Sequence, residues 1–188
     1  MIPYRKQSAY HDQGLIHLPG NEFQEYLDVH PELRAECDKY QWNVNNRYEA
    51  IQPKTPAEFA KLFADSVEYV PRSAATRSWK CALHRELLRQ YILPEYMSRV
   101  MDFGCGAGND GLLYANLGFQ VTFSDVDGVG LDFIRWRLAK RHIASCSVIP
   151  SSVLDFGEFD FVFAIDCLEH IPDAEVYFEK LDRGLQPN

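Results

Sequence analysis

Residues able to bind a cofactor gather around the stretch RVMDFGCGAGNDG, near the middle of the chain. An acidic residue, Asp102, stands at the end of an apolar run, and glycines follow at positions 104, 106 and 108. Glycines at this spacing let the backbone turn tightly and approach a ligand closely. The same stretch also spells G-x-G-x-x-G through Gly106, Gly108 and Gly111, which is typical of a dinucleotide-binding turn. Two classes of cofactor therefore remain open at this loop.

The dinucleotide pattern fits the loop poorly. In that pattern the first glycine follows the strand directly, so that backbone N–H groups reach a pyrophosphate. Here Gly104 follows the strand, and Asn109 then stands where the third glycine belongs. Starting from Gly106 restores the pattern but moves the turn two residues away from the strand. We therefore expect Gly111 to serve helix packing.

Further polar residues follow two later apolar runs. Asp125 ends QVTFSD, where its carboxylate is placed to accept hydrogen bonds from both hydroxyls of a ribose; the alternative is a turn or helix-capping residue. Farther on, DCLEH brings Asp166, Glu169 and His170 onto one turn, a set able to bind Mg²⁺ or Zn²⁺. We predict no metal there. His170 is the best acid–base candidate, and a structural hydrogen bond at a helix start is the alternative.

The elements that must position these residues alternate between strand and helix after Pro94. We predict strands at 99–103, 120–124, 147–149 and 159–165, and helices from near 109, over 129–142 and over 173–181. Such alternation indicates a parallel sheet with right-handed crossovers, and the doubly apolar run FDFVFAI is typical of a strand covered on both faces. Ligands of such sheets bind at the carboxyl ends of the strands, which is where the polar residues stand.

Before Pro94 the chain is helical and rich in aromatic residues. We predict helical segments within 21–30, 31–51, 55–70 and 73–93. Thr55, Pro56 and Glu58 form a capping-box start for the third segment. Eight aromatic side chains are candidates for an apolar pocket, although aromatic residues at helical spacing more often pack in a core; these are Tyr26, Tyr40, Trp42, Tyr48, Phe59, Phe63, Tyr69 and Trp79. We interpret His84 as structural.

Composition and charge exclude several classes of protein. A chain of 188 residues has room for one domain with an appendage, and a net charge of -8 argues against a broad nucleic-acid or anionic-membrane footprint. We interpret the basic run RWRLAKRH, residues 135–142, as a solvated helix face. Five cysteines without a C-x-x-C pair indicate reduced thiols, so we expect a cytoplasmic protein. No window of the sequence approaches the about 18 apolar residues that a membrane-spanning helix needs.

Three segments, in order, resemble the class I S-adenosylmethionine-dependent methyltransferases. Asp102 with its glycines resembles motif I, and FDFVFAIDCLEHIPD resembles the strand-four motif of the small-molecule branch, F-D-x-V followed by L-E-H-x-x-D. YFEKLDRGLQPN is similar to the family's helix followed by R-x-L-K-P-G. The resemblance covers about residues 100–187. It implies a Rossmann-like, doubly wound, mostly parallel α/β sheet in the order 3-2-1-4, with a helical cap at 1–94 and a cofactor-binding core at 95–188.

The resemblance also implies an activity and its residues. A methyl group passes directly from S-adenosylmethionine to a small-molecule acceptor, largely by alignment of the reacting atoms. A carboxylate near the turn holds the cationic amino end of the cofactor, and Ser152 and Val153 replace the family's acidic residue beside the adenine. The implied cofactor-binding residues are Asp102, Gly104, Cys105, Gly106, Gly108, Asp125, Val126, Ser152, Val153 and Ile165. The implied catalytic residue is His170, and DCLEH resembles the E-x-x-E-H metal cluster of some related O-methyltransferases.

One departure from the family concerns the far side of the sheet. Members have three more strands after the fourth, so FDFVFAI is expected to form an apolar edge, which invites pairing with another chain. We expect this chain to be the N-terminal portion of a longer protein, or a second copy or another polypeptide to cover that edge. Two alternatives stay open. One is a noncatalytic module of the same fold, and the other is an NAD-dependent oxidoreductase, which Asn109 disfavours.

Overall fold

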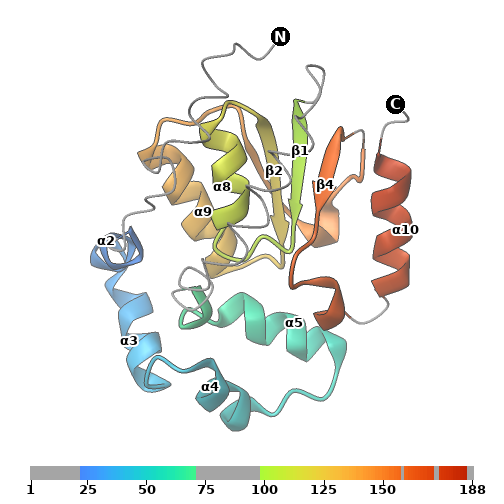
Figure 1. Ribbon diagram of the computed structural model, residues 1–188. Coiled ribbons are helices and arrows are strands. Elements are labelled where there is room, and N and C mark those ends of the chain that lie inside the picture. Colours follow the sequence, from blue (N-terminus) through green and yellow to red (C-terminus); the bar gives the residue numbers. More distant parts are fainter. Residues whose placement is uncertain (1–21, 71–97, 158, 172–173, 186–188) are drawn as a thin grey trace.

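A parallel four-stranded sheet forms the centre of the protein (Figure 1). The computed structural model describes residues 22–70, 98–157, 159–171 and 174–185. The strands are β1 Arg99–Phe103, β2 Gln120–Asp125, β3 Ser147–Pro150 and β4 Phe161–Phe163, and they lie in the order β3-β2-β1-β4. Every pair is parallel. The predicted strand order is therefore confirmed.

The fourth strand is shorter than predicted. Phe159 leaves the ladder with β1 and instead makes a single parallel bridge with Leu185. The Asp160 carboxylate accepts the backbone N–H groups of Ser98 and Arg99, both at 2.8 Å, so at this end a side chain accepts where a backbone carbonyl accepts inside the ladder. The Asp160 N–H still donates to the Arg99 carbonyl, at 2.9 Å. After Phe163 the chain turns out of the sheet toward its carboxyl edge. Side-chain bonding and the turn thus shorten an apolar run that the sequence pattern alone extends over seven residues.

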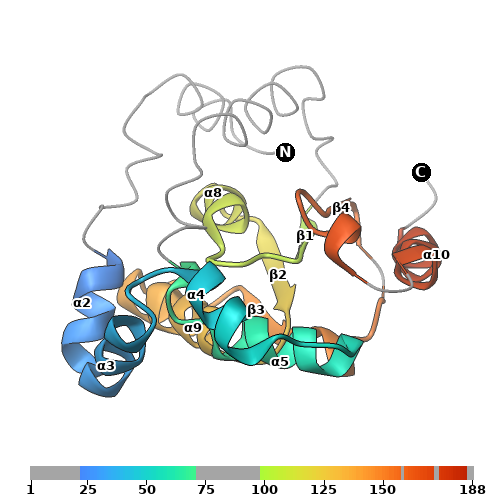
Figure 2. The same ribbon diagram turned by 90° about the horizontal axis from the view of Figure 1, so that it is seen from below.

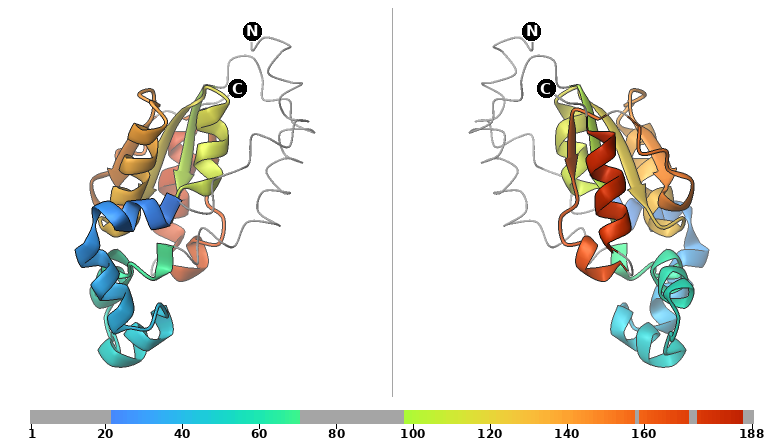
Figure 3. Two further views of the ribbon diagram at one scale, coloured as in Figure 1. Left: turned by 90° about the vertical axis from the view of Figure 1, so that its left-hand side faces the viewer. Right: turned by 90° about the vertical axis from the view of Figure 1, so that its right-hand side faces the viewer.

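Helices cover both faces of the sheet, as Figure 3 shows. The helices α8 Asn109–Asn116 and α9 Val129–Lys140 pack on the face that carries Val100, Val121 and Phe123. On the opposite face, Met101 and Phe103 pack with Leu181 of α10 Ala174–Gly184. Consecutive residues of β1 thus enter different clusters, as side-chain alternation along a strand requires. The predicted doubly wound arrangement is confirmed.

The N-terminal region consists of α2 Glu22–Val29, α3 Pro31–Lys39, α4 Val44–Ile51 and α5 Pro56–Asp65. The predicted helical segment 31–51 is divided in two, because Gln41 and Trp42 adopt positive φ angles of 53° and 58°. Asn43 then caps the N-terminus of α4, where its side chain accepts the N–H of Asn45 at 3.0 Å. The predicted capping box at Thr55 is confirmed by two bonds that join it reciprocally to Glu58, of 3.2 and 3.0 Å.

The N-terminal helices pack on α9 as well as on each other. The ring of Phe23 in α2 lies edge-on against Phe133 of α9, with centroids 5.5 Å apart. Gly128, just before α9, lies so close to α5 that an added Cβ would stand 2.2 Å from the Ala64 carbonyl oxygen. Figures 1 and 2 show α5 beyond the carboxyl ends of the strands. The region therefore lies over the sheet edge at which ligands bind.

Several predictions fall outside the described residues. These are the helix over 73–93 with Trp79 and His84, and the boundary at residues 94 and 95. A membrane-spanning helix must be long and apolar, and the helices of the described residues do not meet both conditions.

Candidate functional site

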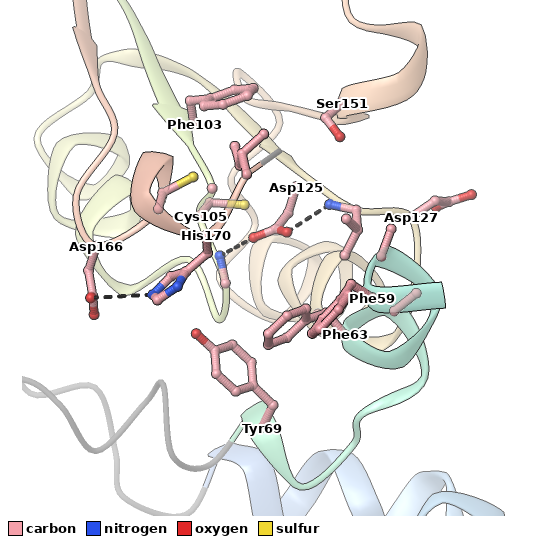
Figure 4. Close-up of a pocket in the computed structure, with 18 of the residues that line it drawn as sticks. Phe59, Phe63, Tyr69, Phe103, Cys105, Asp125, Asp127, Ser151, Asp166 and His170 are labelled. Atoms are coloured by element: carbon pink, nitrogen blue, oxygen red, sulfur yellow. Dashed lines mark hydrogen bonds and ion pairs between the residues drawn. The ribbon is translucent and has the colours of Figure 1, made fainter. Parts of the chain in front are cut away.

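A cavity of about 870 Å³ opens at the carboxyl ends of the strands (Figure 4). Its volume lies in the range of small-molecule sites, about 300–1,000 Å³. Its wall combines the chain after each strand with α5 and α10. The predicted site residues that line it are Asp102, Gly104, Cys105, Gly106, Asp125, Val126, Ser152, Ile165 and His170. The fold therefore brings together most of the residues that the sequence singled out.

The glycine-rich loop is shaped by its backbone and by its neighbours. Gly104, Gly106 and Gly108 have φ angles of 70°, 52° and 73°, in the left-handed region that favours glycine. The N–H groups of Gly104 and Cys105 both donate to the carbonyl of Ser124, at 2.8 and 3.1 Å, which fastens the loop to β2. A Cβ at Gly104 would stand 2.0 Å from Cys167 Sγ, so this glycine also admits the chain after β4.

Two predicted cofactor residues stand apart from the described cavity wall. Gly108 precedes α8, and an added Cβ would lie 2.8 Å from Cγ1 of Ile134, so its missing side chain makes room for α9. Val153 ends the short turn after β3 and is 71% exposed. Ser151 and Ser152 of the same turn do line the cavity. Gly111 lies against Phe123, since a Cβ added at Gly111 would stand 2.3 Å from Cε1 of that ring. This close approach agrees with the prediction that Gly111 serves helix packing.

Asp125 is the carboxylate most directly built into the cavity. Its Oδ2 accepts the N–H of Gly106 at 2.6 Å, and its Oδ1 accepts the N–H of Val126 at 2.7 Å. Burial raises the pKa of Asp125, and these two hydrogen bonds act in the opposite direction. Each carboxylate oxygen can accept a second hydrogen bond, so the group suits a pair of neighbouring hydroxyls.

Asp102 supplies a second carboxylate, deeper in the protein. It is 4% exposed, and its Oδ2 accepts the N–H of Gly111 at 2.9 Å near the start of α8. The thiol of Cys105 is buried as well, and burial raises its pKa well above its ordinary value, with the charges of Asp125 and Asp102 adding to the effect. A thiol of such high pKa stays neutral and is a poor nucleophile. Cys105 therefore serves the site through its backbone and its packing.

His170 lies on the short turn that follows β4. The turn spans Leu168–His170, and Nε2 of His170 stands 3.9 Å from Oδ1 of Asp166. Figure 4 shows the ring directed into the same open space as Tyr69. The ligating atoms of Asp166, Glu169 and His170 lie within 4.8 Å of one another, and all three residues are exposed. The structure thus gives His170 access to the cavity, and the absence of a metal remains a prediction.

Aromatic side chains of the N-terminal region form one wall of the cavity. Phe59 and Phe63 of α5 line it together with Tyr69, and the rings of Phe63 and Tyr69 meet with centroids 5.6 Å apart. By contrast, Tyr26 is buried in the packing between α2 and α9, and burial raises its pKa to about 12. The described wall does not include Tyr40, Trp42 or Tyr48. Of the seven candidates within the described residues, those of α5 and of the segment directly after it line the cavity, and the earlier ones do not.

Sequence reasoning missed three kinds of site residue. Tyr177 and Lys180 of α10 line the cavity, and so does Asp127 after β2. Arg137 donates a hydrogen bond to the Ala107 carbonyl in the glycine-rich loop, although the basic run that contains Arg137 was expected to be solvated. A signal for Arg137 did exist, because it lies three residues after buried Ile134, on the apolar side of α9.

Comparison with known proteins finds that this chain is similar to methyltransferases. Residues 101–188 match a family model described as a methyltransferase domain. The ubiquinone biosynthesis O-methyltransferase of Bradyrhizobium diazoefficiens is 32% identical over 94 residues, and phosphoethanolamine N-methyltransferase 2 of Caenorhabditis elegans is 28% identical over 95. These matches take in 48% and 47% of this chain but only 36% and 21% of the relatives. The chain thus spans about a third or less of the length of these two relatives.

Two solved structures show the same arrangement of elements. A segment titled StiE O-MT residues 942-1257 superposes with a TM-score of 0.51 at 27% identity, over 62% of this chain and 42% of that one. A putative sarcosine dimethylglycine methyltransferase from Galdieria sulphuraria gives a TM-score of 0.52 at 22% identity, over 62% and 46%. The second likeness is one of fold.

Proposed function

We propose that this chain is a class I S-adenosylmethionine-dependent methyltransferase, that its cavity binds S-adenosylmethionine and that the protein methylates a small-molecule acceptor, since residues 101–188 match a methyltransferase-domain model. One observation carries the proposal: the cavity has Asp125 fixed between two backbone N–H groups at the end of β2, directly beside the glycine-rich loop. That arrangement suits a nucleoside whose ribose carries two free hydroxyls. The buried Asp102 carboxylate, on the same wall, suits a cationic group.

The residues present fit the cofactor at each end of the cavity. Asp125 would accept the ribose hydroxyls, and the backbone of Gly104 and Gly106 would lie along the ligand. Ser152 would stand beside the base, and Asp102 would balance the amino group, directly or through water. When bound, the cofactor supplies a methyl group on a sulfonium that is already a reactive donor.

The remaining wall of the cavity would receive the acceptor. Phe59, Phe63 and Tyr69 offer an apolar surface that excludes water and orients the acceptor, and alignment alone supplies much of the rate. His170 can take a proton at Nε2 when the nucleophile carries one. We assign the N-terminal helices the role of an acceptor-side cap on this basis.

Two wider expectations belong to the same proposal. Free thiols at Cys37, Cys105 and Cys146 suit a reducing compartment, so we place the protein in the cytoplasm. We also propose that a second copy or another polypeptide covers the edge of β4, because in the described sheet β4 is an edge strand paired with β1, and Phe178 of α10 is 63% exposed.

Calorimetry with S-adenosylhomocysteine and with NAD tests the proposal. We expect binding of the first alone, and we expect Asp125→Ala to weaken it by about 100-fold, because two hydrogen bonds to a charged group are lost. The control is Asp132→Ala, an exposed carboxylate on α9 that pairs with Arg135. Equal binding by wild type and Asp125→Ala, with both folded, contradicts the assignment. Binding without methyl transfer to any of a broad acceptor panel favours a noncatalytic module.

A further inference from the structure

Arg137 lies inside the protein although it belongs to the basic run 135–142. It is 1% exposed, so the expectation of a solvated face is wrong at this position. Its Nε donates to Oε2 of Glu22 in α2 at 3.1 Å. Its Nη1 donates to the carbonyl of Ala107 and, at 2.9 Å, to Oδ1 of Asn109. One guanidinium thus joins the N-terminal helices to the loop that follows β1.

The neighbouring cations of α9 strengthen the connection to α2. Arg141 also pairs with Glu22, which is 4% exposed, and Lys140 pairs with Glu25. Arg137 and Arg141, one helical turn apart, therefore share the Glu22 carboxylate, and Lys140 pairs with the next acidic residue of α2. Three cations of the basic run are thus used at this helix interface, whereas Arg135, which is exposed, pairs within its own helix.

The chemistry of the contact calls for an arginine. Three acceptors on two separate segments surround the side chain, and a guanidinium presents five N–H donors in a fixed plane, whereas a lysine ammonium acts as a point charge. The loop needs such support, because a run of glycines has little stiffness of its own. Ala107 stands between Gly106, whose N–H holds Asp125, and Gly108, which precedes α8.

We propose that Arg137 is a positioning residue for the cofactor site. By holding Ala107 and Asn109 it fixes the neighbouring Gly106 N–H, and through Glu22 it makes the shape of the loop depend on α2. The N-terminal helices then set cofactor affinity as well as covering the acceptor. This inference rests on the proposed function where it concerns S-adenosylmethionine, whereas the support of the loop stands without it.

The test compares two double variants of the full chain. Arg137→Met with Glu22→Gln removes the guanidinium and the carboxylate together, so that the Arg137 substitution leaves no unpaired buried charge at Glu22. Replacing both members of a buried ion pair is often tolerated. Arg47→Met with Glu68→Gln is the matched control, because it removes another buried arginine–glutamate pair, with bonds of 2.5 and 3.1 Å, within the N-terminal region. Arg137→Lys is the conservative variant.

Two readouts separate positioning from stability. Hydrogen exchange of residues 104–111 is measured without ligand, and affinity for S-adenosylhomocysteine is measured by calorimetry on protein shown to be folded. For the Arg137 double variant we expect exchange and the dissociation constant each to rise about tenfold, as for the loss of one charge-assisted hydrogen bond. The control leaves both unchanged. Arg137→Lys restores the stability of the folded protein but leaves its affinity for S-adenosylhomocysteine reduced.

Three results overturn the proposal: unchanged exchange in the Arg137 double variant, an equal change in the control, or full affinity with Arg137→Lys. A wild-type protein that does not bind S-adenosylhomocysteine contradicts the proposed function instead. In that case exchange of residues 104–111 still decides whether Arg137 supports the loop.

Discussion

The N-terminal helices and the sheet-containing core each bury an arginine beside a glutamate, but the two pairs reach different surroundings. Arg47 bonds to Glu68, lies near Glu36 and stacks over the ring of Tyr40 at 4.1 Å, all within the N-terminal region. Arg137 bonds to Glu22 and, beyond it, to the loop at the cavity. We therefore expect the Arg137 pair, and not the Arg47 pair, to affect the site.

The largest effect should come from breaking the self-contained pair. Arg47→Met leaves the Glu68 carboxylate, which is 1% exposed, without its main partner. We expect the free energy of unfolding to fall by about 3–5 kcal/mol, measured by urea unfolding. Adding Glu68→Gln should recover much of the loss. Cofactor affinity of the folded protein stays the same if the comparison between the two pairs is right.

The next effect concerns the core, at Gly104. Gly104→Ala places a Cβ against Cys167 in a left-handed backbone conformation, at a cost of about 3 kcal/mol from strain and crowding together. Urea unfolding measures it. Gly157→Ala is the matched control, since an added Cβ there meets no described atom within 4 Å. Similar losses in both variants would mean that the loop tolerates a side chain.

A smaller effect is expected at Asp160, far from the cavity. Burial raises the pKa of this carboxyl, but the N–H groups of Arg99 and Ser98, together with the Arg99 charge, lower it overall. Its contribution is therefore present above the unfolded pKa of about 3.9 and is lost as pH falls through the lower folded pKa.

Asp160→Asn tests this contribution through the pH dependence of unfolding. The variant should lose about 1 kcal/mol at neutral pH, and its difference from wild type should shrink in acid. Asp132→Asn, whose carboxylate is exposed, is the control. A difference between Asp160→Asn and wild type that persists at low pH would contradict the account.

Local patterns were most reliable where one short stretch carries the whole signal. The capping box at Thr55 needs only four consecutive residues, and it forms as predicted. The strands of the core follow apolar runs, and their order agrees with the resemblance to a known family. The division of the segment 31–51 into two helices could not be predicted, because the turn at Gln41 and Trp42 uses residue types that rarely adopt a positive φ.

By itself the sequence determined the alternation of strand and helix, the parallel sheet that this alternation indicates, and the acidic and glycine residues at its carboxyl edge. These features depend on periodicity and on the few residues that tolerate unusual backbone angles, whereas the order of the strands came from the resemblance to a known family. Only the tertiary structure decided that Arg137 is buried, that Val153 faces outward and that Phe59 and Phe63 reach the cavity. Such outcomes depend on which distant segment packs against a side chain, and for Arg137 that segment is α2, more than a hundred residues earlier in the chain.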